Sequence, residues 1–249
     1  MILKDKTCLI TGGTKGIGAA TAEALARRGA CIAINGRTRD GQADALLTKL
    51  RANGSRAAFI AGDVAQPEQA TQLVEAGSRE LGFPDVLIHC AGGPAPGGIL
   101  SVSPECWYAA FDLHVHAIFH LCRAVVPHMH EKGEGAIILV SSAAGLRGCM
   151  DSAAYSIVKG ALPQFARSLA RELADDNIRV NCVAPGVIRT RFQDHLTPSR
   201  VANNLQNRIP LHREGRPEDV AELIVTLIAN DYITGETVSI DGGLTMRIA

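Results

Sequence analysis

The sequence predicts an α/β fold, a doubly wound domain in which helices cover both faces of a seven-stranded parallel sheet. Two observations predict it: seven short runs are rich in β-branched and other apolar residues, and segments of helical spacing separate them along the whole chain. Because only a crossover connection joins parallel neighbours, apolar strands separated by helices indicate a parallel sheet that is covered on both faces.

Each element follows from its local pattern. The strands are expected at 7–11, 31–35, 57–61, 86–90, 136–141, 179–183 and 237–240. Helices are expected near 16–28, 40–53, 67–81, 104–132, 153–174 and 217–229. No linker or repeat interrupts this alternation, so residues 1–249 are interpreted as a single domain. Two loop-like segments, at about 93–106 and 186–216, follow the fourth and sixth strands, where the substrate walls of such folds lie.

Composition excludes several classes of protein. The 25 basic side chains balance the 25 acidic ones, which leaves no overall field to hold nucleic acid or an anionic membrane surface. The first residues lack the pattern of a signal peptide, and no apolar run approaches the ~20 residues of a membrane span. The seven cysteines are scattered without a CxxC pair, which favours a reduced, cytoplasmic protein without structural zinc.

A glycine-rich turn, Thr11-Gly-Gly-Thr-Lys-Gly-Ile-Gly18, lies between the first predicted strand and the first helix. Glycines there let the backbone approach a pyrophosphate, and the helix N-terminus offers free N–H groups to it. The turn predicts a dinucleotide site that includes Gly12, Thr14, Lys15, Gly16, Ile17 and Gly18. A plain strand-to-helix turn is the alternative.

The type of dinucleotide is indicated at the end of the second strand, which reads Asn35-Gly36-Arg37. NAD-binding proteins commonly place an acid there to accept the ribose hydroxyls. With Gly36 in that position, Arg37 and Lys15 favour the 2′-phosphate of NADP(H), while NAD(H) remains possible. The alternative is that both cations are ordinary solvated charges.

A tyrosine and a lysine four residues apart, Tyr155 and Lys159, open the helix after the fifth strand and share one helical face. A phenol with a pKa of ~10 exchanges protons slowly near neutrality, and a nearby ammonium favours the phenolate. Ser142 ends the fifth strand, where its hydroxyl can donate to a developing alkoxide. An ordinary i,i+4 surface pair is the competing interpretation of Tyr155 and Lys159.

Together these motifs resemble the short-chain dehydrogenase/reductase family over essentially all 249 residues, most closely its 3-oxoacyl-[acyl-carrier-protein] reductase-like subgroup. The resemblance implies a Rossmann domain in which Tyr155 is the general acid/base, Lys159 lowers its pKa and binds the nicotinamide ribose, and Ser142 holds the substrate oxygen. It also implies cofactor contacts from Tyr155 and Lys159 themselves and from Asp63, Val64, Ala91, Gly92, Pro185, Gly186, Ile188 and Thr190.

The chain departs from the family pattern in three places. His89-Cys90 stands where the family carries two asparagines before Ala91-Gly92. His114 occupies the position of an asparagine that holds a water in the proton relay, and we hypothesise that it takes over this role with a pKa near neutrality. A packed core histidine with a backbone partner is the alternative. Pro163 cannot donate to the carbonyl of Lys159, so a small kink is expected after that lysine.

Further patterns have competing interpretations. Asp112, His116 and His120 form a helical stripe that could bind a metal, but the resemblance implies a subunit interface at this helix instead. The segment 186–216 carries six arginines against Asp194 and Glu214, which suits an anionic substrate or an acidic carrier protein as well as a solvated face. Aromatic and imidazole groups that could shape the pocket are Trp107, Tyr108, Phe192 and His195.

The sequence therefore predicts an NADP(H)-dependent oxidoreductase that interconverts a ketone and a secondary alcohol. We expect a cytoplasmic homo-oligomer, a dimer or tetramer as the resemblance implies, with a small carbonyl or alcohol substrate and without a resident metal, nucleic acid or membrane partner. A dinucleotide-binding sensor or scaffold without turnover is the alternative, because His114 replaces the relay asparagine. A DNA-binding regulator is less favoured, since the sequence has no helix-turn-helix or basic helix.

Overall fold

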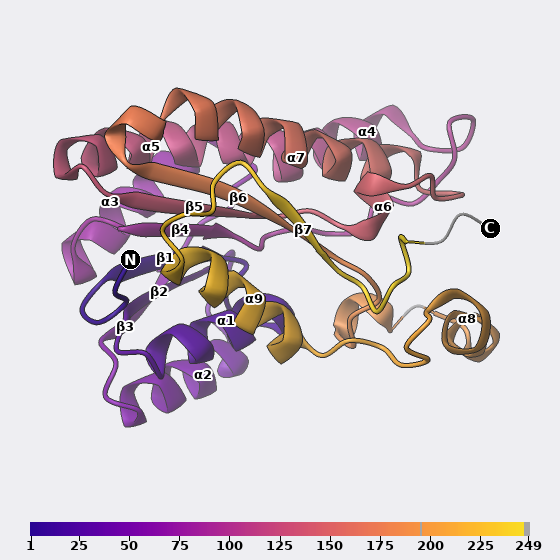
Figure 1. The fold of residues 1–249 in the computed structure, drawn as a ribbon, viewed down its shortest axis with the longest axis horizontal. Helices are drawn as coiled ribbons and strands as arrows, with labels where there is room; N and C mark the ends of the chain where they lie inside the picture. Colours follow the sequence, from indigo (N-terminus) through magenta and orange to yellow (C-terminus); the bar gives the residue numbers. More distant parts are fainter. Residues whose placement is uncertain (195, 247–249) are drawn as a thin grey trace.

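A parallel sheet of seven strands forms the centre of the protein, in the order β3-β2-β1-β4-β5-β6-β7 (Figure 1). The computed structural model describes residues 1–194 and 196–246. The strands are β1 Thr7–Thr11, β2 Cys31–Gly36, β3 Ala57–Ala61, β4 Val86–His89, β5 Gly135–Val140, β6 Ile178–Pro185 and β7 Thr237–Ile240. All pairs are parallel, so the predicted fold class is confirmed.

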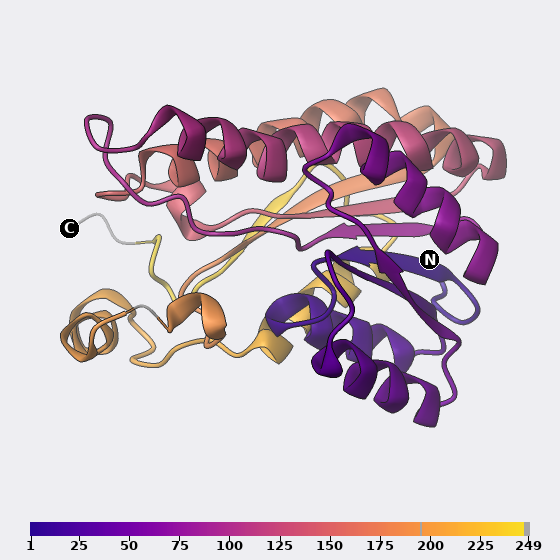
Figure 2. The ribbon, with the colours of Figure 1, turned by 180° about the vertical axis from the view of Figure 1, so that it is seen from behind.

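Helices cover both faces of the sheet, as Figures 1 and 2 show from opposite sides. One face carries α1 Gly16–Ala26, α2 Gly41–Ala52 and α9 Pro217–Ala229, and the other carries α3 Pro67–Leu81, α5 Ala117–Lys132 and α7 Ala153–Glu172. Each face buries its own apolar core against the strands. The chain crosses from one face to the other between β1 and β4, and such a switch point opens a crevice beyond the carboxyl ends of the strands.

Several elements differ from the expected ones. The helix expected over 104–132 consists of α4 Pro104–Phe111, a π-helical turn Asp112–His116 and α5. Short helices that periodicity did not predict, α6 Ala143–Leu146 and α8 Pro198–Asn203, lie at the carboxyl end of the sheet. Turns this short bury too few residues to leave a periodic pattern, whereas π-helical turns often mark functional sites.

One helical run among the described residues, Pro104–Lys132, passes the length and hydropathy test for a membrane span. It spans 29 residues with a mean hydropathy of 1.2 in its most apolar window, so by length and composition it could cross a membrane. Within this run, α5 packs against α3 and β5, and α4 packs against α7. Core helices of α/β domains share this length and composition.

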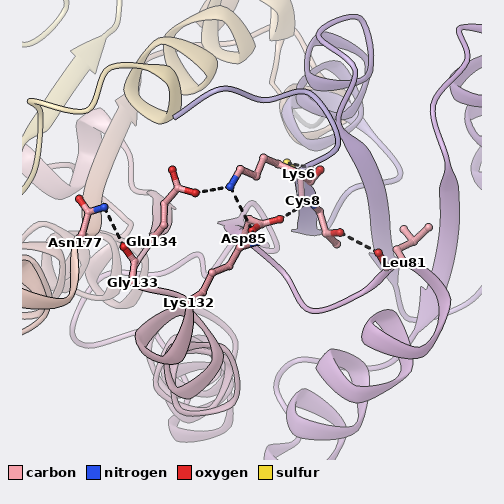
Figure 3. A network of polar contacts seen from close by, with 9 residues as sticks. Lys6, Cys8, Leu81, Asp85, Lys132, Gly133, Glu134 and Asn177 are labelled. Atoms are coloured by element: carbon pink, nitrogen blue, oxygen red, sulfur yellow. Dashed lines mark hydrogen bonds and ion pairs between the residues drawn. The ribbon is translucent and has the colours of Figure 1, made fainter.

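A buried carboxylate, Asp85, joins the amino-terminal ends of the strands (Figure 3). It is 5 % exposed, accepts the Thr7 N–H at 2.8 Å and forms ion pairs with Lys6 and Lys132. Lys6 also pairs with Glu134 at the start of β5. Burial lowers the pKa of Lys6, but its hydrogen bond to Glu134 and the charge of Asp85 outweigh that effect and raise the pKa overall. These contacts connect β1, β4, β5 and α5 at the end of the sheet away from the crevice.

We predict that Asp85→Ala lowers the free energy of unfolding by about 2–4 kcal/mol, because a buried backbone N–H and two ammonium groups lose their common acceptor. Glu134→Gln is the matched control and should cost below about 1 kcal/mol, since its carboxylate is one-third exposed. Urea denaturation measures both. Equal losses in the two variants would contradict the central role of Asp85.

Candidate active site

A cleft of about 1600 Å³ lies beyond the carboxyl ends of the strands, between the segments that follow β1, β4, β5 and β6. Every predicted site residue lines this cleft except Asp63 and Val64. Phe192 lines it as well, whereas Trp107 and Tyr108 do not, and His195 lies outside the described residues. The chain therefore brings together residues that are up to 178 positions apart in the sequence, from Gly12 to Thr190.

The glycine-rich turn is shaped by close backbone contacts. Gly12 has a φ of +61°, and a Cβ at this position would lie 2.7 Å from the Cα of Ala91. Helix α1 begins after Lys15 without a side-chain cap, so its first N–H groups remain available to a ligand in the cleft. A positive helix end and a backbone without side chains fit the pyrophosphate of a dinucleotide.

Asp63 and Val64 follow β3 and lie outside the residues that line the cleft. Val64 is 4 % exposed and belongs to the apolar core, while a carboxylate oxygen of Asp63 accepts the N–H of Ala65 at 3.0 Å. The structure thus uses these residues to shape the turn after β3. Their predicted contact with adenine stays a prediction.

The cations expected near a 2′-phosphate lie at one end of the cleft, with Gly36 and Arg37 on its wall. Lys15 forms an ion pair with Asp40 at 3.2 Å, so part of its charge is already neutralised. Asp40 also caps α2, and its hydrogen bonds to the Ala43 N–H and to Lys15 lower the pKa of its carboxyl group. Arg37 forms no ion pair among the described residues and is the cation more available to an anion.

The ammonium of Lys159 is buried and its residue is 5 % exposed. Nζ donates to the carbonyl oxygen of Val140, the last residue of β5, at 2.7 Å. Burial lowers the pKa of Lys159 to about 8, partly offset by the thiols of Cys182 and Cys90. This places the loss of its proton close to the physiological range.

The backbone of Lys159 is held as firmly as its side chain. Pro163 has no N–H to donate to the Lys159 carbonyl, and the hydroxyl of Ser141 donates to it instead, at 2.7 Å. Helix α7 continues past Pro163 to Glu172. Gly145 of α6 packs on the same carbonyl, because a Cβ there would lie 2.7 Å from that oxygen. The missing N–H at Pro163 was the sequence signal for this contact, but it did not identify the donor.

Tyr155 lies between Lys159, His114 and Phe192. The Lys159 Nζ is 5.9 Å from its ring centroid, and the rings of His114 and Phe192 are 5.9 and 5.8 Å away. Burial raises the pKa of Tyr155, and a hydrogen bond with Ser142 lowers it in part. The lowering of the Tyr155 pKa by Lys159, which the resemblance implies, stays a prediction. Ser142 rather than Lys159 is the direct hydrogen-bond partner of the phenol.

The expected titration of His114 near neutrality is corrected by the structure. His114 is 1 % exposed, and burial, assisted by the charge of Lys159, lowers its pKa to about 2. Its Nε2 contacts the backbone of Gly93, 3.1 Å from the carbonyl oxygen, whereas its buried Nδ1 has no hydrogen-bond partner among the described residues. A Cβ on Gly92 would lie 3.4 Å from this Nδ1 and 3.6 Å from the Lys159 Nζ. The neutral imidazole therefore faces the same small space as the ammonium.

The residues that depart from the family pattern at the end of β4, His89 and Cys90, lie in buried surroundings where His89 contacts β1. Nδ1 of His89 lies 2.9 Å from the hydroxyl of Thr11, and the same hydroxyl accepts the N–H of Ala91 at 3.3 Å. Burial lowers the pKa of His89 to about 3, so this side chain is neutral, and burial raises the pKa of Cys90 to about 12. The contact between the Thr11 hydroxyl and the His89 imidazole thus joins β1 to β4.

In the helical stripe of Asp112, His116 and His120, two side chains form a hydrogen-bonded pair at the surface. Nδ1 of His116 lies 2.8 Å from a carboxylate oxygen of Asp112, and both side chains are about half exposed. Within residues 1–194 and 196–246, no three potential ligands from histidine, cysteine, aspartate and glutamate are grouped as a metal would require.

We predict that Ser141→Ala lowers the free energy of unfolding by about 1–3 kcal/mol, because the Lys159 carbonyl loses its donor. Pro163→Ala supplies a helical N–H to that carbonyl, so the double variant should recover about 1 kcal/mol of this loss. A double-mutant cycle by chemical denaturation, with kcat as a second readout, measures the coupling. Additive effects, within about 0.5 kcal/mol, would show that the two residues do not share this carbonyl.

Comparison with known proteins gives the same assignment over nearly the whole chain. A family model described as "Enoyl-(Acyl carrier protein) reductase" matches residues 12–245. A 3-oxoacyl-[acyl-carrier-protein] reductase of Chlamydia muridarum is 33 % identical over 98 % of this chain and 98 % of its own length. A tropinone reductase homolog of Arabidopsis thaliana is 36 % identical over 98 % of this chain and 94 % of its own.

A solved structure agrees in fold as well as in sequence. L-sorbose reductase from Gluconobacter frateurii, complexed with NADPH and L-sorbose, has a TM-score of 0.92 and is 31 % identical, with all of both chains covered. The two proteins thus share one fold over their whole lengths. The chain belongs to the short-chain dehydrogenase/reductase family and is an oxidoreductase of that family.

Proposed function

We propose that this protein uses NADP(H) to interconvert a ketone and a secondary alcohol, with Ser142, Tyr155 and Lys159 as its catalytic residues. The observation that carries the proposal is the meeting of these three side chains with the uncapped N-terminus of α1 in one cleft. A nicotinamide dinucleotide held by the glycine-rich turn would supply the hydride for ketone reduction, or take it up in alcohol oxidation. The protein's own groups orient the carbonyl and move the proton.

Each catalytic residue has a defined task. Tyr155 gives its hydroxyl proton to the ketone oxygen during reduction and takes it back during oxidation. Ser142, already in contact with the phenol, donates a hydrogen bond to the same oxygen as negative charge develops on it. The Lys159 ammonium lies over the phenol ring and stabilises the phenolate once Tyr155 has lost its proton.

The cofactor proposal rests on the wall around the glycine-rich turn. Small residues would leave room for the pyrophosphate and expose backbone atoms to it; these are Gly12, Gly16, Gly18 and Ala91. The cleft is also lined by the segment after β6, with Pro185, Gly186, Ile188 and Thr190. Arg37 beside Gly36 favours a 2′-phosphate over a free ribose hydroxyl. The solved relative with NADPH bound supports this choice.

Compartment and assembly belong to the same proposal. We place the protein in the cytoplasm because all seven cysteines are free, four of them buried. We propose a homo-oligomer because large apolar side chains remain exposed on α4, α5 and α7, among them Tyr108, Phe119 and Ile157. The segments 93–106 and 186–216 form the substrate walls of a single catalytic domain.

The direct test is incubation with NADPH or NADH and a panel of ketones and diketones, followed by absorbance of the reduced nicotinamide. We expect turnover with a higher kcat/KM for NADPH, and a loss of that preference by about 10- to 100-fold in Arg37→Gln. Arg39→Gln is the matched control, since Arg39 pairs with Asp44. NADPH binding without any loss of absorbance would favour the sensor instead.

The pKa of Lys159 makes a prediction about pH. Because burial lowers it to about 8, the ammonium is present below pH 8 and is lost as the pH rises through that value. The kcat/KM for ketone reduction should therefore fall above about pH 8, approaching tenfold per pH unit. His114, with a pKa of about 2, adds no limb between pH 5 and 9. A profile that stays flat to pH 10 would contradict the burial of the lysine.

We propose that His114 acts as a neutral positioning residue for Lys159, its Nδ1 facing the space beside the ammonium. His114→Ala should lower kcat by roughly tenfold or more, and His114→Asn should restore most of it, since an amide also donates and accepts. The upper pH limit of kcat/KM should shift in His114→Ala and return in His114→Asn. Unchanged turnover and pH profile in both variants would leave His114 a packed core residue only.

A further inference from the structure

The outer part of the cleft carries arginines whose charge is not neutralised by the protein. Three of the lining guanidinium groups there belong to Arg147, which follows α6, and to Arg200 and Arg208, in and after α8. Within residues 1–194 and 196–246, none of the three forms an ion pair. Figure 1 shows that α6 and α8 lie at the same end of the molecule.

Two other arginines of the same region are paired with carboxylates, unlike Arg147, Arg200 and Arg208. Arg189 pairs with Glu214 at 2.9 Å, and Arg213 pairs with Asp219 at 3.2 Å. Arg191 also lines the cleft and forms no ion pair among the described residues. It follows Thr190, whose methyl group would lie 3.1 Å from a Cβ on Gly16 of the glycine-rich turn.

Two of the unpaired guanidinium groups are held in place by neutral acceptors. Nη1 of Arg208 donates to the side-chain oxygen of Asn204, at 2.9 Å, and Asn204 is 5 % exposed. Nε of Arg147 donates to the carbonyl oxygen of Thr245, at 3.2 Å. A neutral acceptor orients a guanidinium without cancelling its charge, so both groups stay available to an anion.

The carboxy-terminal turn joins these arginines into one wall. Leu211, just beyond Arg208, donates its N–H to the carbonyl of Gly242 at 3.1 Å. Gly242 has a φ of +64°, and a Cβ there would lie 2.8 Å from Ile209. The turn then reaches Thr245, whose carbonyl holds Arg147.

Carboxylates are scarce on this wall. Among the described lining residues the acidic side chains are Asp40, which pairs with Lys15 at the cofactor end, and Asp151, which is exposed. Phe192 packs against Tyr155, with the ring centroids 5.8 Å apart, so a ketone at Tyr155 has an apolar neighbour. Positive charge lies farther along the same segment, at Arg200 and Arg208.

We propose that the substrate is a small ketone acid, whose anionic group, a carboxylate or a phosphate, binds Arg147, Arg200 and Arg208 while its carbonyl meets Tyr155. This inference rests on the proposed function and names its substrate class. The arginines align the substrate through the charge remote from the reacting carbon, and they select against neutral ketones of the same shape.

The test compares matched pairs of substrates that differ only in charge. Acetoacetate, 4-oxopentanoate and 5-oxohexanoate are each compared with their methyl esters, and dihydroxyacetone phosphate with dihydroxyacetone, using NADPH. The anion of at least one pair should have a kcat/KM tenfold or more above its neutral partner, and this ratio should fall as salt is added. The carboxylate and phosphate pairs distinguish the two kinds of anion.

Substitutions of single arginines test whether these side chains cause the preference for anionic substrates. Arg147→Gln and Arg208→Gln should each lower the anion-to-neutral ratio about tenfold, whereas Arg213→Gln, which removes a paired arginine outside the cleft lining, should keep it. Neutral partners that react as fast as the anions would overturn the proposal. A preference seen only for ketones carried on an acidic carrier protein would overturn it too.

A binding measurement separates this inference from the proposed function. Calorimetry with 3-hydroxybutyrate, 4-hydroxypentanoate and their methyl esters, in the presence of NADPH, reports the anion site without turnover. Tighter binding of an acid, weakened in Arg208→Gln, supports the site even where no ketone reacts, and then only the proposed reaction fails. Equal binding of acids and esters overturns the site whatever the activity.

Discussion

The candidate site depends on the hydrogen bond between the buried ammonium group of Lys159 and the end of strand β5. Burial takes Lys159 out of water at a cost that appears as its lowered pKa, and the carbonyl of Val140 is its one hydrogen-bond acceptor among the described residues. That carbonyl belongs to the last residue of β5, so the position of the charge follows the position of the strand. The hydroxyl of Ser141 then fixes the backbone of the same lysine. Ser142, the next residue, contacts the phenol.

The arrangement explains why neighbouring residues are small or neutral. Gly92 and Gly145 leave room for the lysine and for the helix that carries it, and a side chain at either position would meet that lysine or His114. His89 and His114 are both held neutral by burial, and the lysine's charge lowers their pKa values further. A second positive charge beside Lys159 would compete with the ammonium for the same site. The two histidines thus supply hydrogen-bonding groups without adding charge.

Most of the fold could be predicted from the sequence because buried parallel strands are apolar throughout and short. Each of the seven strands lies within two residues of its expected bounds, and the long helices follow their apolar spacing. The short helices α6 and α8 could not be predicted, since neither contains a full amphipathic repeat. The π-helical turn at Asp112–His116 was hidden for a related reason, because its spacing differs by a fraction of a turn from that of the flanking helices.

The candidate site was predictable where a motif carries its own chemistry and less so where contacts decide. Spacing identified Tyr155 and Lys159, and the glycine-rich turn identified the dinucleotide end. The state of His114 depends on burial and on a charge 45 positions away in the sequence, so its neutrality could not be read from residue type. Likewise, six arginines in one segment look alike in sequence. Only the structure separates Arg189 and Arg213, which pair with Glu214 and Asp219, from Arg208, which is held by the neutral side chain of Asn204.

The central claim is that the Tyr155 hydroxyl supplies the proton in a hydride transfer carried out at this cleft. Single-turnover oxidation of bound NADPH by a ketone, in the parent protein and in Tyr155→Phe at saturating NADPH, tests it most directly. We expect a rate at least a hundredfold lower in the variant, with NADPH binding still measurable. A variant that oxidises NADPH within about threefold of the parent rate would contradict it.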